Sequence, residues 1–178
     1  MPEGRFEVKL AGIGGQGIVL AGRILALGAF LDGRWVTCIQ SYSARVRGAP
    51  VESDVVISER KIAYPFVRRP DFLVALAEPA FRFAAQASLT ITDESLSRLR
   101  DKVGGRLVLA PIFRTAREIG SEGLSNMVAL GLLTGLTGIV SPSSMEEAIA
   151  RSVGARYLEK DLEAFRAGLE LAHRTTRT

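Results

Sequence analysis

The chain has 178 residues, of which 47% are hydrophobic and 24% are charged, as in ordinary globular proteins. Its single cysteine, Cys38, excludes an internal disulfide and leaves an iron–sulfur cluster or a cysteine-rich zinc site without enough ligands. The net charge of +4 comes mostly from scattered arginines without interleaved aromatic residues, so the composition does not predict a nucleic-acid partner.

Neither a membrane span nor an export signal is predicted. The longest apolar run, Val128–Val140, is interrupted by glycine and threonine and falls short of the roughly 20 residues that cross a bilayer. The first residues, MPEGRFEVKLAG, contain no basic segment that leads into an apolar stretch. We therefore expect a cytoplasmic protein without a membrane partner, and the lone cysteine agrees with a reducing compartment.

The first half of the chain alternates between strands and helices. A strand rich in Phe, Val and Leu precedes a glycine loop, and an apolar helix follows that loop. The segment ERKIAYPFVRRP contains two prolines and several cations, which indicates a surface loop. The strands predicted here are Phe6–Ala11, Trp35–Ile39, Val55–Ser58 and Phe72–Leu76, and the helix is Ile18–Phe30.

The second half is predicted to be more helical. Asp93 is placed to cap a helix, and Ser143–Glu146 has capping-box spacing. The predicted strands are Leu89–Thr92 and Arg106–Pro111; the predicted helical segments are Pro79–Ala87, Glu94–Lys102, Thr115–Ile119, Ser125–Leu136, one starting at Ser143, and Tyr157–Arg174. We expect an α/β fold: a single Rossmann-like domain over residues 1–178, with a mostly parallel sheet flanked by helices and a helical C-terminal third.

The glycine loop, GIGGQG, matches the G-x-G-x-x-G spacing of dinucleotide-binding sites. In that motif Gly12 permits a tight turn, Gly14 lets the backbone approach a pyrophosphate, and Gly17 lets the helix pack closely. The start of the following helix offers free N–H groups to an anion. Gly15 lies within the loop, and the Gln16 amide is able to donate to a ligand or to a neighbouring backbone group.

A complete dinucleotide site is disfavoured by the second strand. A ribose-binding acid is expected at its end, but the strand ends in Ile39-Gln40-Ser41, and Asp32 belongs to the turn before it. Three alternatives remain for the loop: a turn that only seats the helix, an anion site, and the dinucleotide site of a free-standing NAD(P)-linked oxidoreductase.

Several segments in one order resemble the gamma subunit of the 2-oxoacid:ferredoxin oxidoreductases, which act on pyruvate, 2-oxoglutarate or branched 2-oxo acids. The similarity covers about Val8 to Ile149. Its segments are GIGGQGIVLAGRILALGAF, QSYSARVRGAP, SDVVIS, DFLVAL and SNMVALGLLTG. The segment KIAYP is slightly closer to the 2-oxoglutarate branch than to the pyruvate branch.

The resemblance implies a division of labour among subunits. Such complexes decarboxylate a 2-oxo acid oxidatively with thiamine diphosphate, pass electrons through iron–sulfur clusters to ferredoxin, and transfer the acyl group to coenzyme A. The implied partners are alpha, beta and ferredoxin-like delta subunits, and ferredoxin through the complex. This chain is expected to bind neither thiamine nor a cluster, to lack catalytic and metal-ligating residues, and to be inactive alone. A homodimer of the isolated chain is compatible with such assemblies.

The resemblance also implies where contacts lie. Tyr42, Arg47 and Gly48 match the family's second loop, which is expected near coenzyme A or a subunit interface, and Asn126 matches its asparagine at the start of the apolar helix. The loop departs from the family pattern at Ser43, Ala44, Arg45 and Ala49, where the family commonly has Gly, Pro, Glu and Gly. Arg45 reverses a charge, which puts any contact through that carboxylate in doubt.

Each of these assignments has a simpler alternative. The arginines of the second loop are then exposed to solvent without a partner molecule, and Asn126 only caps its helix. The lone His173 is expected to be a surface residue.

Overall fold

The computed structural model describes residues 4–42 and 48–175. Its six strands form one sheet in the order β2-β3-β1-β4-β5-β6. Five strands run in the same direction, and only β3 is antiparallel to its neighbours β1 and β2. The predicted mostly parallel α/β fold is confirmed. The strands are β1 (Arg5–Ile13), β2 (Trp35–Tyr42), β3 (Pro50–Ser58), β4 (Phe72–Ala75), β5 (Leu89–Asp93) and β6 (Arg106–Ala110).

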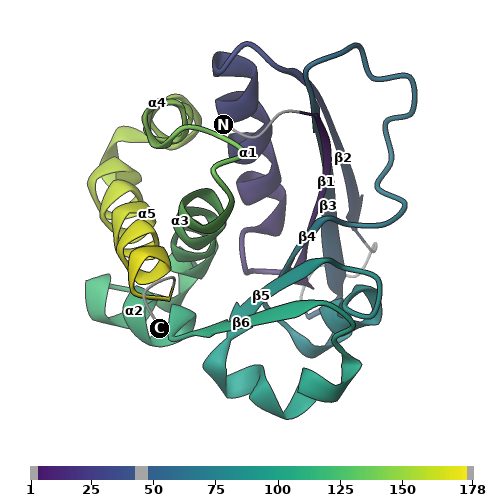
Figure 1. Cartoon of the computed structure of the whole chain (residues 1–178). Helices are drawn as coiled ribbons and strands as arrows, with labels where there is room; N and C mark the ends of the chain where they lie inside the picture. The colour runs from purple at the N-terminus through teal and green to yellow at the C-terminus, as the bar shows by residue number, and fades with distance from the viewer. Residues whose placement is uncertain (1–3, 43–47, 176–178) are drawn as a thin grey trace.

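The α-helices gather on one face of the sheet, as Figure 1 shows. The α3 helix is buried from Ser125 to Thr134 because α1, α5 and the sheet enclose it, which explains why its sequence is apolar on every side. The expected helical C-terminal third is present. The helices are α1 (Ile18–Leu31), α2 (Ile112–Ile119), α3 (Ser125–Thr137), α4 (Pro142–Ser152) and α5 (Ala155–Thr175).

Helices α3 and α5 touch through their backbones. A side chain at Gly131 would overlap the carbonyl of Phe165, and one at Gly168 would overlap the carbonyl of Val128. Glycine at both positions therefore allows an approach that any larger residue would prevent. On the side of α5 that faces this contact, Phe165 and Ala172 are fully buried.

The opposite face of the sheet is covered by shorter elements. The segments predicted as α-helices at Pro79–Ala87 and Glu94–Lys102 form 3-10 helices at Glu78–Phe83 and Glu94–Lys102 instead. A small apolar cluster holds them to the sheet, with Phe81 and Leu99 packed on Leu73 of β4. Asp93 caps the second of these helices as predicted, because its carboxylate accepts a hydrogen bond from the backbone N–H of Ser95 at 2.9 Å.

Successive side chains of β1 point to opposite faces of the sheet, which explains why charged and apolar residues alternate along this strand. Val8 and Leu10 point into the core under α1, whereas Lys9 points to the other face and pairs with Glu52 and Asp54 of β3. The predicted surface loop between β3 and β4 crosses this face, where the backbone N–H groups of Arg68 and Arg69 donate to the carboxylate of Glu7.

The start of α4 differs from the prediction. Its N-cap is Ser141, whose hydroxyl accepts a hydrogen bond from the Ser144 backbone, whereas Ser143 and Glu146 form no capping box. Glu146 pairs with Arg166 of α5 instead. The helical turn predicted at Thr115–Ile119 begins earlier, at Ile112. Within residues 4–42 and 48–175, no helix has the length and apolarity that a membrane crossing requires.

Candidate functional site: the glycine-loop edge

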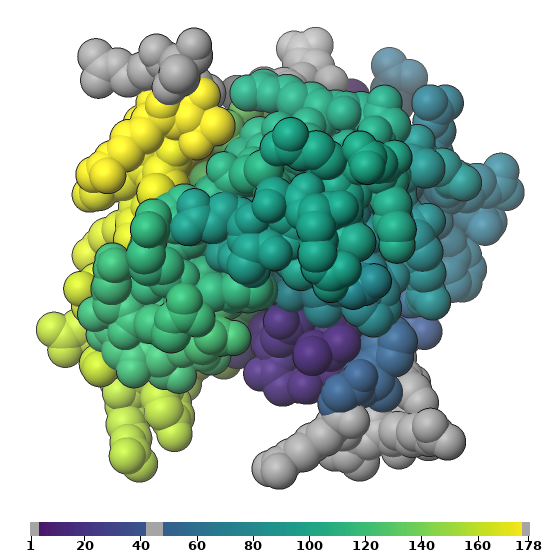
Figure 2. All heavy atoms as spheres, turned by 90° about the horizontal axis from the view of Figure 1, so that it is seen from below, coloured from purple at the N-terminus to yellow at the C-terminus, as the bar shows by residue number. Residues whose placement is uncertain are grey.

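The carboxyl edge of the sheet brings the predicted site segments together. Strands β1 and β2 both end there, and β3 begins there, so the loop after β1 lies beside the β2–β3 connection. Figure 2 views this edge from below: the purple glycine loop lies between green residues that precede α3 and the blue ends of the β2–β3 pair. Ligand sites of open α/β sheets occur at such edges.

The side chain of Gln16 holds the glycine loop in place through two hydrogen bonds to the backbone. Its Oε1 accepts a hydrogen bond from the Ile13 N–H at 2.9 Å, and its Nε2 donates to the Leu76 carbonyl, just after β4, at 2.8 Å. The sequence left two roles open for the Gln16 amide, which were donation to a ligand and donation to a neighbouring backbone group. In the structure the amide donates to the backbone. A Cβ at Gly12 would overlap the Gln16 Oε1, so Gly12 makes room for this bracing.

Gly17 forms the junction between the loop and α1. It is the N-cap of α1 and has a left-handed backbone (φ 68°), which glycine adopts without strain. A Cβ here would overlap the amide of Asn126, which begins α3. The sequence motif predicted that Gly17 allows the following helix to pack closely. In the structure, the element packed closely against Gly17 is α3.

Asn126 is buried and ties α3 to α1. Its Nδ2 donates to the Gly17 carbonyl at 3.2 Å, and its Oδ1 accepts from the Met127 N–H at 2.9 Å. The same Gly17 carbonyl also accepts the first hydrogen bond of α1, from Ala21. Asn126 therefore has satisfied amide groups inside the fold and positions the glycine loop rather than facing solvent.

The loop nevertheless leaves an open surface at the start of α1. Gly14 donates its N–H to the Ala49 carbonyl, and the adjacent Gly15 is exposed. Beside them lies a hollow of about 460 Å³, which contains the first turn of α1. No side chain caps this helix end and no acid lies in its first turn, and the residues of that turn line the hollow. The lining residues are Ile13, Gly14, Gly15, Gly17, Ile18, Val19, Leu20, Arg23 and Val51.

Arg23 is a lining residue that the sequence analysis missed. It is the only charged residue of α1, and its guanidinium lies 3.5 Å from the Gln40 side chain on β2. A single cation in an otherwise apolar helix is the sequence signal that would have drawn attention to it.

The second predicted loop is described only in part. The Tyr42 backbone ends β2 opposite Val51, and Gly48 is exposed with a left-handed backbone (φ 74°). Arg47, together with the departures Ser43, Ala44 and Arg45, lies outside the described residues. Ala49, which directly precedes β3, is buried.

The strand order does not form the crevice of a dinucleotide-binding βαβ unit. In that unit the second strand pairs directly with the first, and its terminal acid reaches the ribose. Here β3 separates β1 from β2. Asp32 has a different role, because it accepts hydrogen bonds from the Ser141 backbone and from the hydroxyls of Ser141 and Ser144, each at 2.7 Å. Although burial raises the pKa of Asp32, these bonds outweigh it and hold the pKa below its ordinary value.

Within the described part of the chain, no three His, Cys, Asp or Glu side chains gather as metal ligands would. The half-buried Cys38 lies on β2, and burial raises the pKa of its thiol.

Comparison with known proteins identifies the family. The model of the family "Pyruvate ferredoxin/flavodoxin oxidoreductase" matches residues 7–171. The chain belongs to this family.

Relatives within the pyruvate ferredoxin/flavodoxin oxidoreductase family extend over the whole chain. The 2-oxoglutarate synthase subunit KorC of Methanothermobacter thermautotrophicus is 41% identical, covering 96% of this chain and 97% of the relative. The pyruvate/ketoisovalerate oxidoreductases common subunit gamma of Pyrococcus furiosus is 31% identical, covering 93% and 96%. The crystal structure of the keto/oxoacid ferredoxin oxidoreductase gamma subunit from Geobacter sulfurreducens has a TM-score of 0.79 at 33% identity, covering 96% and 98%. The predicted resemblance to the gamma subunits of this family is confirmed.

Proposed function

We propose that this chain is the gamma subunit of a 2-oxoglutarate:ferredoxin oxidoreductase. The complex would convert 2-oxoglutarate and coenzyme A into succinyl-CoA and CO₂, and would pass two electrons to ferredoxin. The observation that carries the proposal is the near full-length match to 2-oxoglutarate synthase subunits at 41% identity, against 31% for a subunit shared by pyruvate and ketoisovalerate enzymes.

In this proposal the thiamine diphosphate and the iron–sulfur clusters are held by the alpha, beta and delta subunits. The composition supports this division, because Cys38 is the only cysteine and clusters are ligated by several. The gamma chain would contribute to assembly through the edge that contains the glycine loop.

We further propose that the hollow at the start of α1 contacts the phosphate groups of coenzyme A. Uncapped N–H groups of a 14-residue helix and the guanidinium of Arg23 are the donors that phosphate oxygens prefer. Apolar side chains in the lining, such as Val19 and Leu20, would cover the uncharged part of the molecule.

Co-expression with the thiamine-binding and ferredoxin-like chains tests the function. The assembled complex should reduce ferredoxin in the presence of 2-oxoglutarate and coenzyme A, with a higher kcat/KM for 2-oxoglutarate than for pyruvate or 2-oxoisovalerate. The isolated chain should show no turnover with any of the three. A preference for pyruvate would contradict the substrate assignment, and turnover by the isolated chain with NAD(P) would contradict the subunit assignment.

A further inference from the structure

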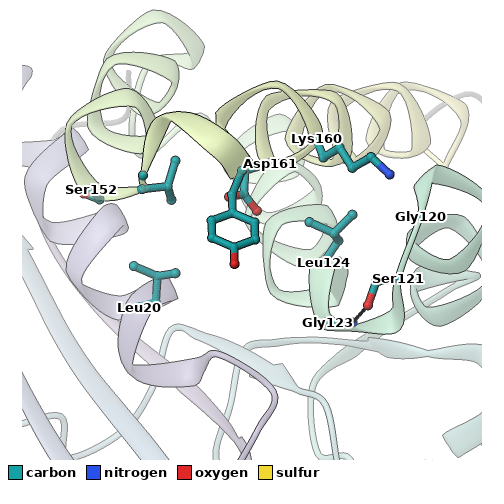
Figure 3. Close-up of a pocket in the computed structure, with 11 residues that line it drawn as sticks. Leu20, Gly120, Ser121, Gly123, Leu124, Ser152, Lys160 and Asp161 are labelled. Atoms are coloured by element: carbon teal, nitrogen blue, oxygen red, sulfur yellow. Dashed lines mark hydrogen bonds between the residues drawn. The ribbon is translucent and has the colours of Figure 1, made fainter.

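A second cavity lies on the helical side of the same edge of the molecule. It has a volume of about 530 Å³ and is bordered by the start of α1, the segment before α3, and the α4–α5 junction. Figure 3 shows Leu20 and Leu124 on its walls and Asp161 projecting from α5 toward the space they border. Leu20 also lines the hollow beside the glycine loop, so the two depressions adjoin along α1.

Asp161 is unusual among the buried acids of the described residues. Its exposed fraction is 8%, yet no hydrogen bond or ion pair reaches its carboxylate from residues 4–42 or 48–175. The two other buried acids are satisfied: Glu7 pairs with Arg5, and Asp93 accepts from two backbone N–H groups. Its carboxylate oxygens are not among the fully buried atoms that lack a partner, so they reach the open space of the cavity and are accessible to a donor from another molecule.

The neighbouring cation, Lys160, does not pair with this carboxylate. Lys160 precedes Asp161 on α5, but its ammonium lies against Gly120 on another wall of the cavity. Figure 3 shows the Lys160 side chain extending toward Gly120. Burial raises the pKa of Asp161, with no hydrogen bond to oppose it. The remaining walls are largely apolar, with Leu20, Leu124 and Val153 among them.

We propose that this cavity receives a basic side chain, arginine or lysine, from another subunit of the complex. Such a side chain fits both features of the cavity, because its aliphatic stem packs on apolar walls and its charged head donates to the carboxylate. Tyr157, 60% exposed on the cavity lining, supplies an aromatic surface of the kind that concentrates binding energy in protein interfaces. The inference rests on the proposed function, since it requires the oligomeric complex.

The test compares Asp161→Asn with Glu159→Gln, an exposed acid on the same helix that loses the same charge. Each full-length variant is titrated with the other subunits of the complex, and its thermal unfolding is measured alone. We expect Asp161→Asn to raise the Kd for assembly at least about tenfold, as loss of a buried interfacial charge pair does. Its thermal unfolding should be unchanged or shifted upward. Tyr157→Ala should weaken assembly by about threefold, whereas Glu159→Gln should leave it unchanged.

Three outcomes overturn the inference. Equal Kd values for the wild type and Asp161→Asn would show that no partner cation uses the carboxylate. A lower unfolding temperature of isolated Asp161→Asn would show that Asp161 is needed within the fold. Loss of self-association of the isolated chain, with assembly intact, would place a second copy in the cavity. Failure of the wild type to assemble would instead refute the proposed function, on which this inference depends.

Discussion

The two ends of α1 differ in how their polar groups are satisfied. At the C-terminal end, the carboxylate of Asp32 accepts three hydrogen bonds from Ser141 and Ser144 and thereby fixes the start of α4. At the N-terminal end, Gly17 supplies no side-chain cap, and the first turn faces an open hollow. The nearby carboxylate of Asp161 has no donor among the described residues.

The difference distinguishes polar groups that stabilise the fold from those available to other molecules. The donors for Asp32 come from a segment 109 residues away in the chain, so folding itself completes the C-terminal end. Folding does not complete the N-terminal end, whose N–H groups, Arg23 and Asp161 retain binding capacity. Mutations at the closed end should therefore change stability, and mutations at the open end should change binding.

The largest expected effect on stability is at Gly17, which lies at the open end of α1 but packs against Asn126 inside the fold. Gly17→Ala should lower the free energy of unfolding by about 3 kcal/mol, because it strains a left-handed backbone and displaces the Asn126 amide. Gly15→Ala is the matched control: φ is also positive (101°), but its Cβ would meet open space, so the loss should be about 1 kcal/mol. Urea denaturation measures both, and equal losses would show that the Asn126 contact is unimportant.

The second largest effect on stability is expected at Asp32, at the C-terminal end of α1. Asp32→Asn should lower the free energy of unfolding by about 2 kcal/mol at pH 7, because an amide cannot accept from three donors as the carboxylate does. Asp101→Asn, an exposed acid in the 3-10 helix after β5, should change it by less than about 0.5 kcal/mol. A loss shared by both variants would indicate an effect of net charge instead.

The pH dependence of this contribution follows from the lowered pKa of Asp32. A carboxyl whose pKa is lower in the folded than in the unfolded chain stabilises the fold above its unfolded pKa. That stability is lost as the pH falls below about 4 and through the folded-state pKa. The difference in unfolding free energy between the wild type and Asp32→Asn should therefore shrink in acid.

A smaller effect, on binding alone, is expected at Arg23. Arg23→Gln in the assembled complex should raise the KM for coenzyme A about fivefold, equivalent to about 1 kcal/mol, and leave the KM for 2-oxoglutarate unchanged. Arg106→Gln removes an exposed arginine at the opposite edge of the sheet and should change neither value. An unchanged KM for coenzyme A in Arg23→Gln would argue against phosphate contact in the hollow.

The smallest effect has the opposite sign. Isolated Asp161→Asn should be more stable than the wild type by about 0.5 kcal/mol at pH 7, because burial disfavours the charged carboxylate. Because the pKa of Asp161 is higher in the folded than in the unfolded chain, the wild type loses stability as the pH rises through the folded-state pKa of this group. The advantage of the variant should therefore disappear at low pH, where Asp161 is protonated. Thermal unfolding of both proteins at pH 3 and pH 7 measures this loss of the variant's advantage.

Local patterns in the sequence predicted most of the elements but not their partners. The β1–loop–α1 unit was predicted because apolar periodicity and glycine spacing are local. The position of β3 between β1 and β2 was not, since strand order depends on tertiary pairing. Adjacent serines gave the wrong cap for α4, because Ser141 is selected by a contact with Asp32 far away in the chain. Helical segments were predicted at Pro79–Ala87 and Glu94–Lys102, but sequence patterns this short do not distinguish a 3-10 helix from an α-helix.

The candidate site was predicted in outline and missed in detail. The glycines, Gln16 and Asn126 were found through motif and resemblance, but the bracing roles of Gln16 and Asn126 require coordinates. The signal for Asp161 was present in the sequence: it lies three residues after Leu158 and four before Phe165, on an apolar stripe of α5 that also contains Leu162, Leu169 and Ala172. A charged residue on such a stripe is a reason to expect an unusual environment.

The glycine contact between α3 and α5 has a consequence for biosynthesis. The ribosome delivers α3 well before Ala155, where α5 begins, so the nascent chain contains a uniformly apolar helix whose cover has not yet been made. During that interval the apolar surface of α3 lacks its native cover, and exposed surface of this kind makes incomplete chains prone to aggregation. Docking of Gly168 against Gly131 ends this exposure.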